Sequence, residues 1–167
     1  MNSLKPFSAR IALCSMTLLL TVASHAGNEQ SRSFDDWRLP TALVGVWNIT
    51  SKPVDCVSGQ LLPVPPIIGM IAFHAGGTST EAAPTATPRT PGLGTWFRTG
   101  LHGYTATAHV MNYDVNGFST GSLVVRREIS VAKNGGSFTA TGRTTITDAS
   151  GNEIQRCTVN SAVRADN

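Results

Sequence analysis

A few ionisable and aromatic side chains lie within segments that otherwise consist of small and apolar residues. His74 and Glu81 flank a short glycine turn, and Trp96 and Arg98 share one face of a later segment by the two-residue alternation of strands. Together these four would orient a ligand carboxylate or carbonyl, or would perform general acid–base chemistry with Glu81 and His74 as catalytic residues. The commoner arrangement is an ion pair between Glu81 and Arg98 on adjacent strands, with His74 exposed at the turn.

His109 and Arg127 occupy the centres of two long strand-like segments. Alternation places Arg127 on the same face as Val125 and Ile129. An inward-facing Arg127 would anchor the anionic head group of a fatty acid or a similar ligand. Near a rim, it would instead pack its stem on apolar neighbours and extend its head into water. His109 would carry a proton, although a lone strand histidine is more often a surface or hydrogen-bonded residue.

The sequence contains none of the strong catalytic motifs. There is no G-x-S-x-G, no H-E-x-x-H, no phosphate loop and no C-x-x-C, so nucleophile, zinc and nucleotide chemistry lack their usual residues. We therefore predict no metal site and no cofactor, and we favour a binding protein over an enzyme. The predicted ligand-binding residues are Trp96, Arg98, Arg127 and His109.

The first 26 residues have the pattern of a secretory signal peptide. Lys5 and Arg10 form a positive n-region, residues 11–22 are apolar, and a small-x-small cleavage site ends at Ala26. Cleavage there would leave about 140 residues, which is enough for one domain with its own core. The pattern predicts a secreted or periplasmic protein.

Charge and hydropathy exclude several classes of partner. The chain has 13 Lys plus Arg against 10 Asp plus Glu, and two of the cations lie in the signal, so the mature chain is close to neutral. A nucleic-acid partner is therefore not expected. No later run is long and apolar enough for a membrane helix, and a content of 41% hydrophobic and 14% charged residues is not that of a disordered chain.

Three cysteines are present, of which Cys14 lies within the signal. Cys56 and Cys157 remain, and two cysteines in an oxidising compartment most simply form one disulfide. Two buried free thiols, or a redox or metal site, are less favoured because no histidine lies near either cysteine and C-x-x-C is absent.

Residues 27–42 are polar and mixed, and we interpret them as an N-terminal arm before a β domain over 43–167. From residue 43 onward, Thr, Val, Ile and aromatic runs alternate with Gly, Asn, Asp and Pro, which is typical of antiparallel β structure. The eight predicted strands cover residues 44–50, 67–74, 78–83, 94–99, 104–113, 119–131, 137–147 and 153–164.

Most of the connections are short turns, which favours an up-and-down arrangement of sequential neighbours. The exceptions are the proline-rich segments 51–66 and 84–93, which we expect to be loops without a central strand. Both long loops fall on the same rim of an eight-stranded barrel. A Cys56–Cys157 bridge would then join the first and last strands, an adjacency that a closed barrel requires and an open sheet or sandwich does not.

Gly45-Val46-Trp47 resembles the G-x-W that opens the first strand of lipocalins and other calycins. The resemblance implies that Trp47 lies at the closed end of the barrel with Arg164, at the end of the last strand, packed across its ring. Other small eight-stranded barrels, including allene oxide cyclase and dirigent-like barrels, stay open as alternatives. Residues 73–78 and 91–96 also resemble secreted bacterial barrel proteins of unassigned function.

Three functions follow from an exported barrel of this kind. The first is binding of a small, largely apolar molecule at the looped mouth, with Trp96 and Arg98 as the principal contacts. The second is a cyclase or isomerase of allene-oxide-cyclase-like type that uses Glu81 and His74. The third is a periplasmic interaction or inhibitor protein that binds a protein partner through the arm or the proline loops.

Overall fold

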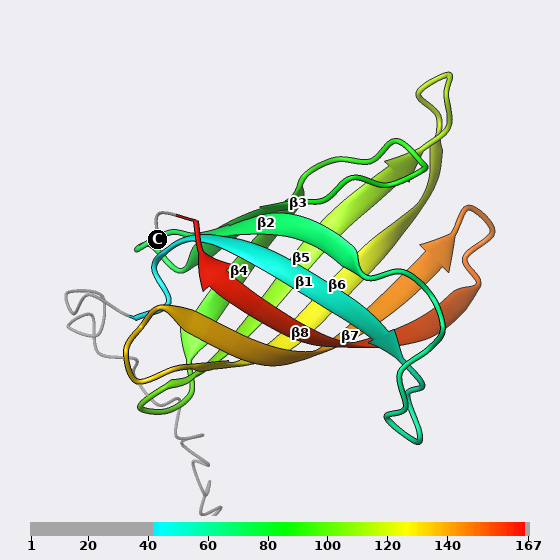
Figure 1. The fold of residues 1–167 in the computed structure, drawn as a ribbon. Helices are drawn as coiled ribbons and strands as arrows, with labels where there is room; N and C mark the ends of the chain where they lie inside the picture. The colour runs from blue at the N-terminus through cyan, green and yellow to red at the C-terminus, as the bar shows by residue number, and fades with distance from the viewer. Residues whose placement is uncertain (1–41, 166–167) are drawn as a thin grey trace, which may run out of the picture. The chain divides into compact units, whose positions relative to one another are not determined.

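The computed structural model describes residues 42–165, and this part of the chain is all-β (Figure 1). The predicted signal peptide and all of the predicted arm except Ala42 lie outside the described residues. No helix among residues 42–165 is long and apolar enough to cross a membrane. The eight strands are β1 (Gly45–Val54), β2 (Ile67–Phe73), β3 (Thr78–Ala82), β4 (Gly92–Arg98), β5 (Gly103–Tyr113), β6 (Ser119–Val131), β7 (Ser137–Asp148) and β8 (Glu153–Arg164).

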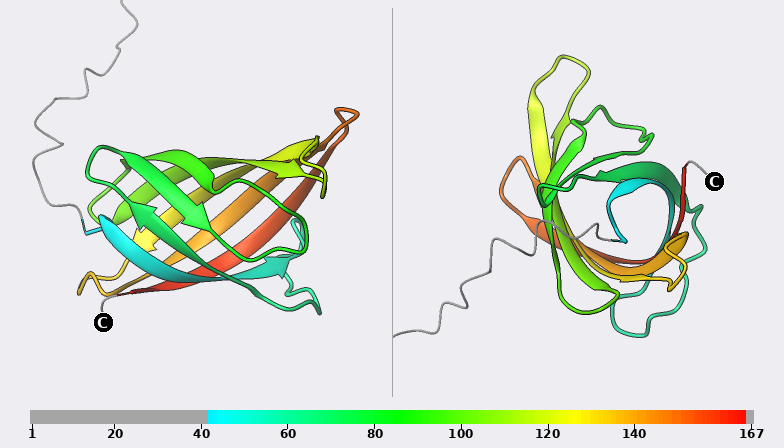
Figure 2. Two further views of the ribbon diagram at one scale, coloured as in Figure 1. Left: turned by 90° about the horizontal axis from the view of Figure 1, so that it is seen from above. Right: turned by 90° about the vertical axis from the view of Figure 1, so that its left-hand side faces the viewer.

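The strands form one closed antiparallel barrel in which each pairs with its neighbours in sequence. β1 closes the barrel by pairing with β8, from Trp47 opposite Arg164 to Val54 opposite Cys157. Figure 2 shows the strands wrapped around a common axis. This pairing confirms the up-and-down barrel and excludes the open sheet and the sandwich.

Alternation along each strand determines which side chains fill the barrel. On β5 the buried residues are Tyr104, Ala106, Ala108 and Val110, whereas His109 between them is exposed. The small alanines leave room in the lumen for large side chains from other strands. Inward and outward faces therefore follow the predicted two-residue period.

An aromatic cluster closes one end of the barrel. Trp47 packs edge-on against Phe138 with ring centroids 4.9 Å apart, and Trp96 lies 5.8 Å from Tyr104 and 6.2 Å from Phe73. These five side chains are at most 7% exposed. This end of the barrel is filled by packed aromatic side chains.

Arg164 covers the closed end from outside. Its guanidinium carbon lies 4.5 Å from the centre of the Trp47 ring, and its nitrogens donate hydrogen bonds to the carbonyls of Gly135, Val44 and Ala42. The expected packing of Arg164 on Trp47 is therefore present, combining stacking with cation–π attraction.

The first strand continues beyond its predicted end. Residues 51–54 pair with β8, although pairing with β2 stops at Ser51 opposite Ile67. The Pro53 carbonyl accepts from the Leu62 amide at 3.0 Å. The Pro53 nitrogen therefore faces the loop rather than β8, because the N and O atoms of one strand residue point the same way. The predicted end of this strand at residue 50 was therefore wrong, and Pro53 is accommodated because β2 does not pair with the strand on that side.

The other end of the barrel is the mouth, on the right in Figure 1, where the 55–66 and 83–91 loops lie. An isolated bridge from Val54 to Leu61 folds the first loop, and one from Arg89 to Asn112 holds the second against β5. The long loops therefore share the mouth, as the strand order predicts.

Candidate functional site

A cavity of about 570 Å³ opens at the mouth of the barrel. Its walls are largely apolar and include Ile49, Ile67, Leu123, Val125 and Ile146, and the 55–66 loop contributes Leu62 and Val64. Cavities of roughly 300–1,000 Å³ with mostly apolar walls and a few polar groups are typical of small-molecule sites. The aromatic cluster fills the opposite end of the barrel.

An ion pair crosses the lumen at the inner limit of this cavity. Arg127 Nη1 on β6 lies 2.5 Å from Glu81 Oε2 on β3, and the two side chains are only 10% and 12% exposed. β3 and β6 are not neighbours, since β4 and β5 separate them in the sheet. The pair therefore links opposite walls of the barrel.

Small residues provide the space that this ion pair occupies. Arg127 lies in register with Ala106 on one side and Gly142 on the other. Gly92 is in register with Glu81, and a Cβ added there would lie 2.4 Å from the Glu81 Cγ. A side chain at position 92 would therefore require the Glu81 side chain to move.

Two buried polar atoms near this level have no hydrogen-bond partner among residues 42–165. They are Arg127 Nε and Asn160 Oδ1; the Asn160 amide nitrogen donates to the Ala140 carbonyl. A buried group without a partner costs about 1–3 kcal/mol. Arg127 therefore has donor capacity left after it has paired with Glu81.

The cavity carries excess positive charge. Arg89, Arg127 and Arg156 line it, and Glu81 is the single acidic residue among the lining residues that the structure describes. Arg89 Nη2 donates to the Ala83 carbonyl at 3.3 Å, and Arg156 is exposed. Two guanidinium groups near the mouth therefore have no carboxylate partner within the cavity lining.

The structure does not bring together the four residues His74, Glu81, Trp96 and Arg98. Trp96 belongs to the aromatic cluster, where its Nε1 donates to the carbonyls of His74 and Thr78. Trp96 therefore lies at the closed end, although the looped mouth was expected.

Arg98 also lies away from the mouth. Its Nε and Nη2 donate to the carbonyls of Gly100 and Leu101, in the short turn between β4 and β5. The alternative ion pair between Glu81 and Arg98 does not form either, because Glu81 pairs with Arg127.

Both predicted histidines are on the outside of the barrel. His74 is exposed beside the β2–β3 turn, with Nε2 3.4 Å from Thr80 Oγ1. His109 is exposed on the outer face of β5. Of the predicted ligand-binding and catalytic residues, the cavity contains Arg127 and Glu81.

Sequence reasoning identified the two members of the ion pair but not their contact. Alternation placed Arg127 on the apolar face, and the structure confirms that it points inward. The sequence feature that could have indicated this contact is a pair of glycines. Gly92 pairs with Glu81 and Gly142 pairs with Arg127, and both leave space beside the charged side chains.

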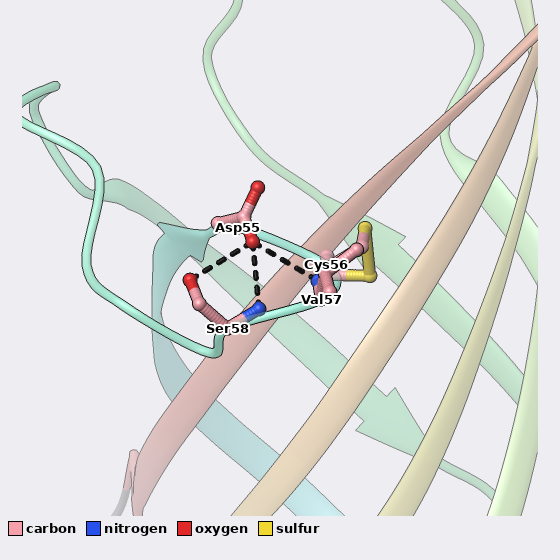
Figure 3. The surroundings of a disulfide bond; sticks show 5 residues. Asp55, Cys56, Val57 and Ser58 are labelled. Atoms are coloured by element: carbon pink, nitrogen blue, oxygen red, sulfur yellow. Dashed lines mark hydrogen bonds between the residues drawn. A yellow bond between two sulfur atoms is a disulfide. The ribbon is translucent and has the colours of Figure 1, made fainter.

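The predicted disulfide between Cys56 and Cys157 is present, with its Cα atoms 5.2 Å apart (Figure 3). The adjacent Asp55 Oδ1 accepts from the amides of Val57 and Ser58 and from the Ser58 hydroxyl. These hydrogen bonds, from Ser58 first and then Val57, lower the pKa of Asp55. The disulfide joins the 55–66 loop to β8 beside the cavity.

No protein-family model matches this sequence, and a comparison with curated proteins finds no significant match. The closed eight-stranded antiparallel barrel is consistent with a calycin-like fold. The described residues thus form a small β-barrel with a disulfide between Cys56 and Cys157.

Proposed function

We propose that this chain binds a small, largely apolar ligand in the mouth cavity. The observation that carries the proposal is the cavity itself: about 570 Å³ with apolar walls around a buried ion pair. Apolar walls favour transfer of an apolar ligand from water, and a few fixed polar groups orient it. The contacts lie on the barrel walls at Ile49 and Val125 and at Arg127, rather than at Trp96 and Arg98.

The ion pair supports a binding role for the cavity. Replacing a buried ion pair by packed apolar residues is often neutral or stabilising by about 1–4 kcal/mol. The Glu81–Arg127 pair is therefore a weak source of stability in the lumen of a barrel that has its aromatic core elsewhere. A few polar groups placed within largely apolar walls are typical of sites that orient a small ligand.

The proposed site of action is outside the cytoplasm. The signal-like pattern of residues 1–26 supports export, and the Cys56–Cys157 disulfide is compatible with it because disulfides persist in oxidising compartments. The ligand would then be a molecule available in the periplasm or outside the cell.

Native mass spectrometry of the protein purified from its own compartment tests the proposal. Wild type is expected to carry an adduct that Val125→Trp loses, because Val125 lines the cavity and a tryptophan there would fill it. Val124→Trp is the matched control, since the neighbouring residue faces the other way. An adduct-free mass for wild type, or equal loss in both variants, would refute the proposal.

A barrel isomerase is the second candidate, because Glu81 lies in the cavity with one oxygen bound by Arg127. Such a carboxylate would move a proton on a bound ligand, and the guanidinium would stabilise the developing negative charge. His74 has no part in this version, since it lies outside the barrel. The third hypothesis concerns the arm, which lies outside the described residues, or the proline loops, and no contact described above favours it.

The ligand recovered from the protein distinguishes an isomerase from a simple binding protein. If Glu81 moves a proton, wild type and Glu81→Gln will release compounds of equal mass but different chromatographic retention. Glu128→Gln, on the outer face of β6, is the control. Identical retention for all three proteins would reject the isomerase.

A further inference from the structure

The charges of the mouth cavity lie at two levels. At the inner level, Arg127 is neutralised by Glu81. At the outer level, Arg89 and Arg156 line the cavity, and no acidic residue apart from Glu81 lines it among the described residues. We call the Glu81–Arg127 pair the floor of the cavity, which is neutral overall, and Arg89 with Arg156 its rim, which is positive.

The strand registers place Arg156 above the floor. Arg127 is in register with Gly142, and Gly142 with Thr158. Arg156 is two residues from Thr158 toward the start of β8, which lies at the mouth. Two residues along a strand span roughly 7 Å, so Arg156 lies about that far along β8, toward the mouth, from the residue in register with the Arg127 row.

Arg89 reaches the mouth end of the cavity from the 83–91 loop. Its guanidinium donates to the carbonyl of Ala83, two residues beyond Glu81 in the direction of the mouth. Arg89, in the loop that follows β3, and Arg156, on β8, therefore both contribute positive charge on the mouth side of the Glu81–Arg127 pair.

The floor is suited to a neutral hydrogen-bond acceptor. Arg127 Nε is buried and has no partner within the described chain. A ligand carboxylate placed there would lie next to the Glu81 carboxylate, and like charges at such a distance repel strongly in a water-poor site. A carbonyl, ether or hydroxyl oxygen accepts from Arg127 without this repulsion.

We infer that the ligand is an apolar carboxylic acid that binds with its carboxylate outward, near Arg89 and Arg156. Its apolar body lies along the cavity walls, and a neutral oxygen function on its inner part faces Arg127. The inference rests on the proposed function, and it reverses the orientation in which Arg127 would anchor the acid group.

Isothermal titration calorimetry with three probes tests this orientation. The probes are dodecanoic acid, methyl dodecanoate, and a dodecanoic acid that carries a ketone midway along its chain. Wild type is expected to bind the acid about tenfold or more tightly than the ester, as for a charge-assisted hydrogen bond. The ketone is expected to increase affinity further, and added salt should weaken binding of the acids but not of the ester.

Arginine variants locate the carboxylate. The double variant Arg89→Gln/Arg156→Gln is expected to lose most of the preference for acid over ester. Arg143→Gln is the control, because Arg143 is exposed on the outer face of β7 while its removal changes the net charge in the same sense. Circular dichroism will verify that the variants are folded.

The outcomes separate this inference from the proposed function. Equal binding of acid and ester by wild type, or an acid preference that survives in Arg89→Gln/Arg156→Gln, would overturn the outward orientation while leaving the cavity as a ligand site. The outward orientation would also be overturned if Arg143→Gln lost as much of the preference for acid over ester as the double variant does. Absence of binding by all three probes would refute the proposed function itself.

Discussion

Breaking the ion pair in the lumen should destabilise the barrel more than removing both of its members. Glu81→Leu leaves the Arg127 guanidinium without its partner at a site where the two side chains are 12% and 10% exposed. Removing one member of a fully buried pair costs about 3–5 kcal/mol. Because the cavity opens toward the mouth, water can approach the stranded charge, and we expect about 2–4 kcal/mol for this substitution.

The double variant Glu81→Leu/Arg127→Met should recover most or all of that loss. It removes both charges and adds apolar side chains to a lumen whose walls are already apolar, a replacement that is neutral or stabilising by about 1–4 kcal/mol in other proteins. The coupling free energy between the two positions should therefore be at least about 2 kcal/mol. The same variant should lose the additional affinity that the ketone gives to the acid, because Arg127 no longer donates to the ketone oxygen.

Equilibrium unfolding in urea measures these changes for wild type, both single variants and the double variant. Glu128→Leu is the control, since Glu128 is exposed on the outer face of the same strand and its loss should change stability by less than about 0.5 kcal/mol. A coupling energy below about 0.5 kcal/mol would show that the pair behaves as a solvent-exposed one. A double variant less stable than either single variant would show that the pair is needed for folding.

Three further perturbations address the features around the cavity. Replacing both Cys56 and Cys157 by serine opens a covalent loop with a sequence separation of 101 and should lower the free energy of unfolding by up to about 4–5 kcal/mol; an unchanged guanidinium midpoint would contradict this. Gly92→Ala should displace the Glu81 carboxylate from its arginine partner, because the new Cβ would meet Glu81 Cγ at 2.4 Å; a crystal structure of the variant with the ion pair intact would exclude the proposed steric role. The lowered pKa of Asp55 means that its loop hydrogen bonds contribute stability above the ordinary aspartate pKa and that this contribution is lost as pH falls through the lowered value. Thermal melts of wild type and Asp55→Ala should therefore differ near pH 7 and converge in acid, and a constant difference would contradict the assignment.

The sequence by itself determined the strands and their faces. Alternation of side chains is a local property with a period of two. It therefore predicted, without knowledge of the fold, that Arg127 lies on the apolar face of its strand and that His109 lies on the same face as Thr105 and Thr107. Gly and Asn turns fixed the order of neighbours, and that order brought Cys56 and Cys157 to the same rim. These features need information from only one or two adjacent strands.

Only the tertiary structure decided which side chains meet across the lumen. Glu81 and Arg127 belong to strands that share no hydrogen bonds, and their contact depends on closure of the barrel and on the stagger of all strands between them. Closure of the barrel also places Trp96 in the aromatic cluster at the closed end rather than at the mouth. It also left one side of β1 free at Pro53, where a proline is tolerated. Local patterns predicted the walls of this barrel, whereas the position of its charged floor is a property of the closed sheet.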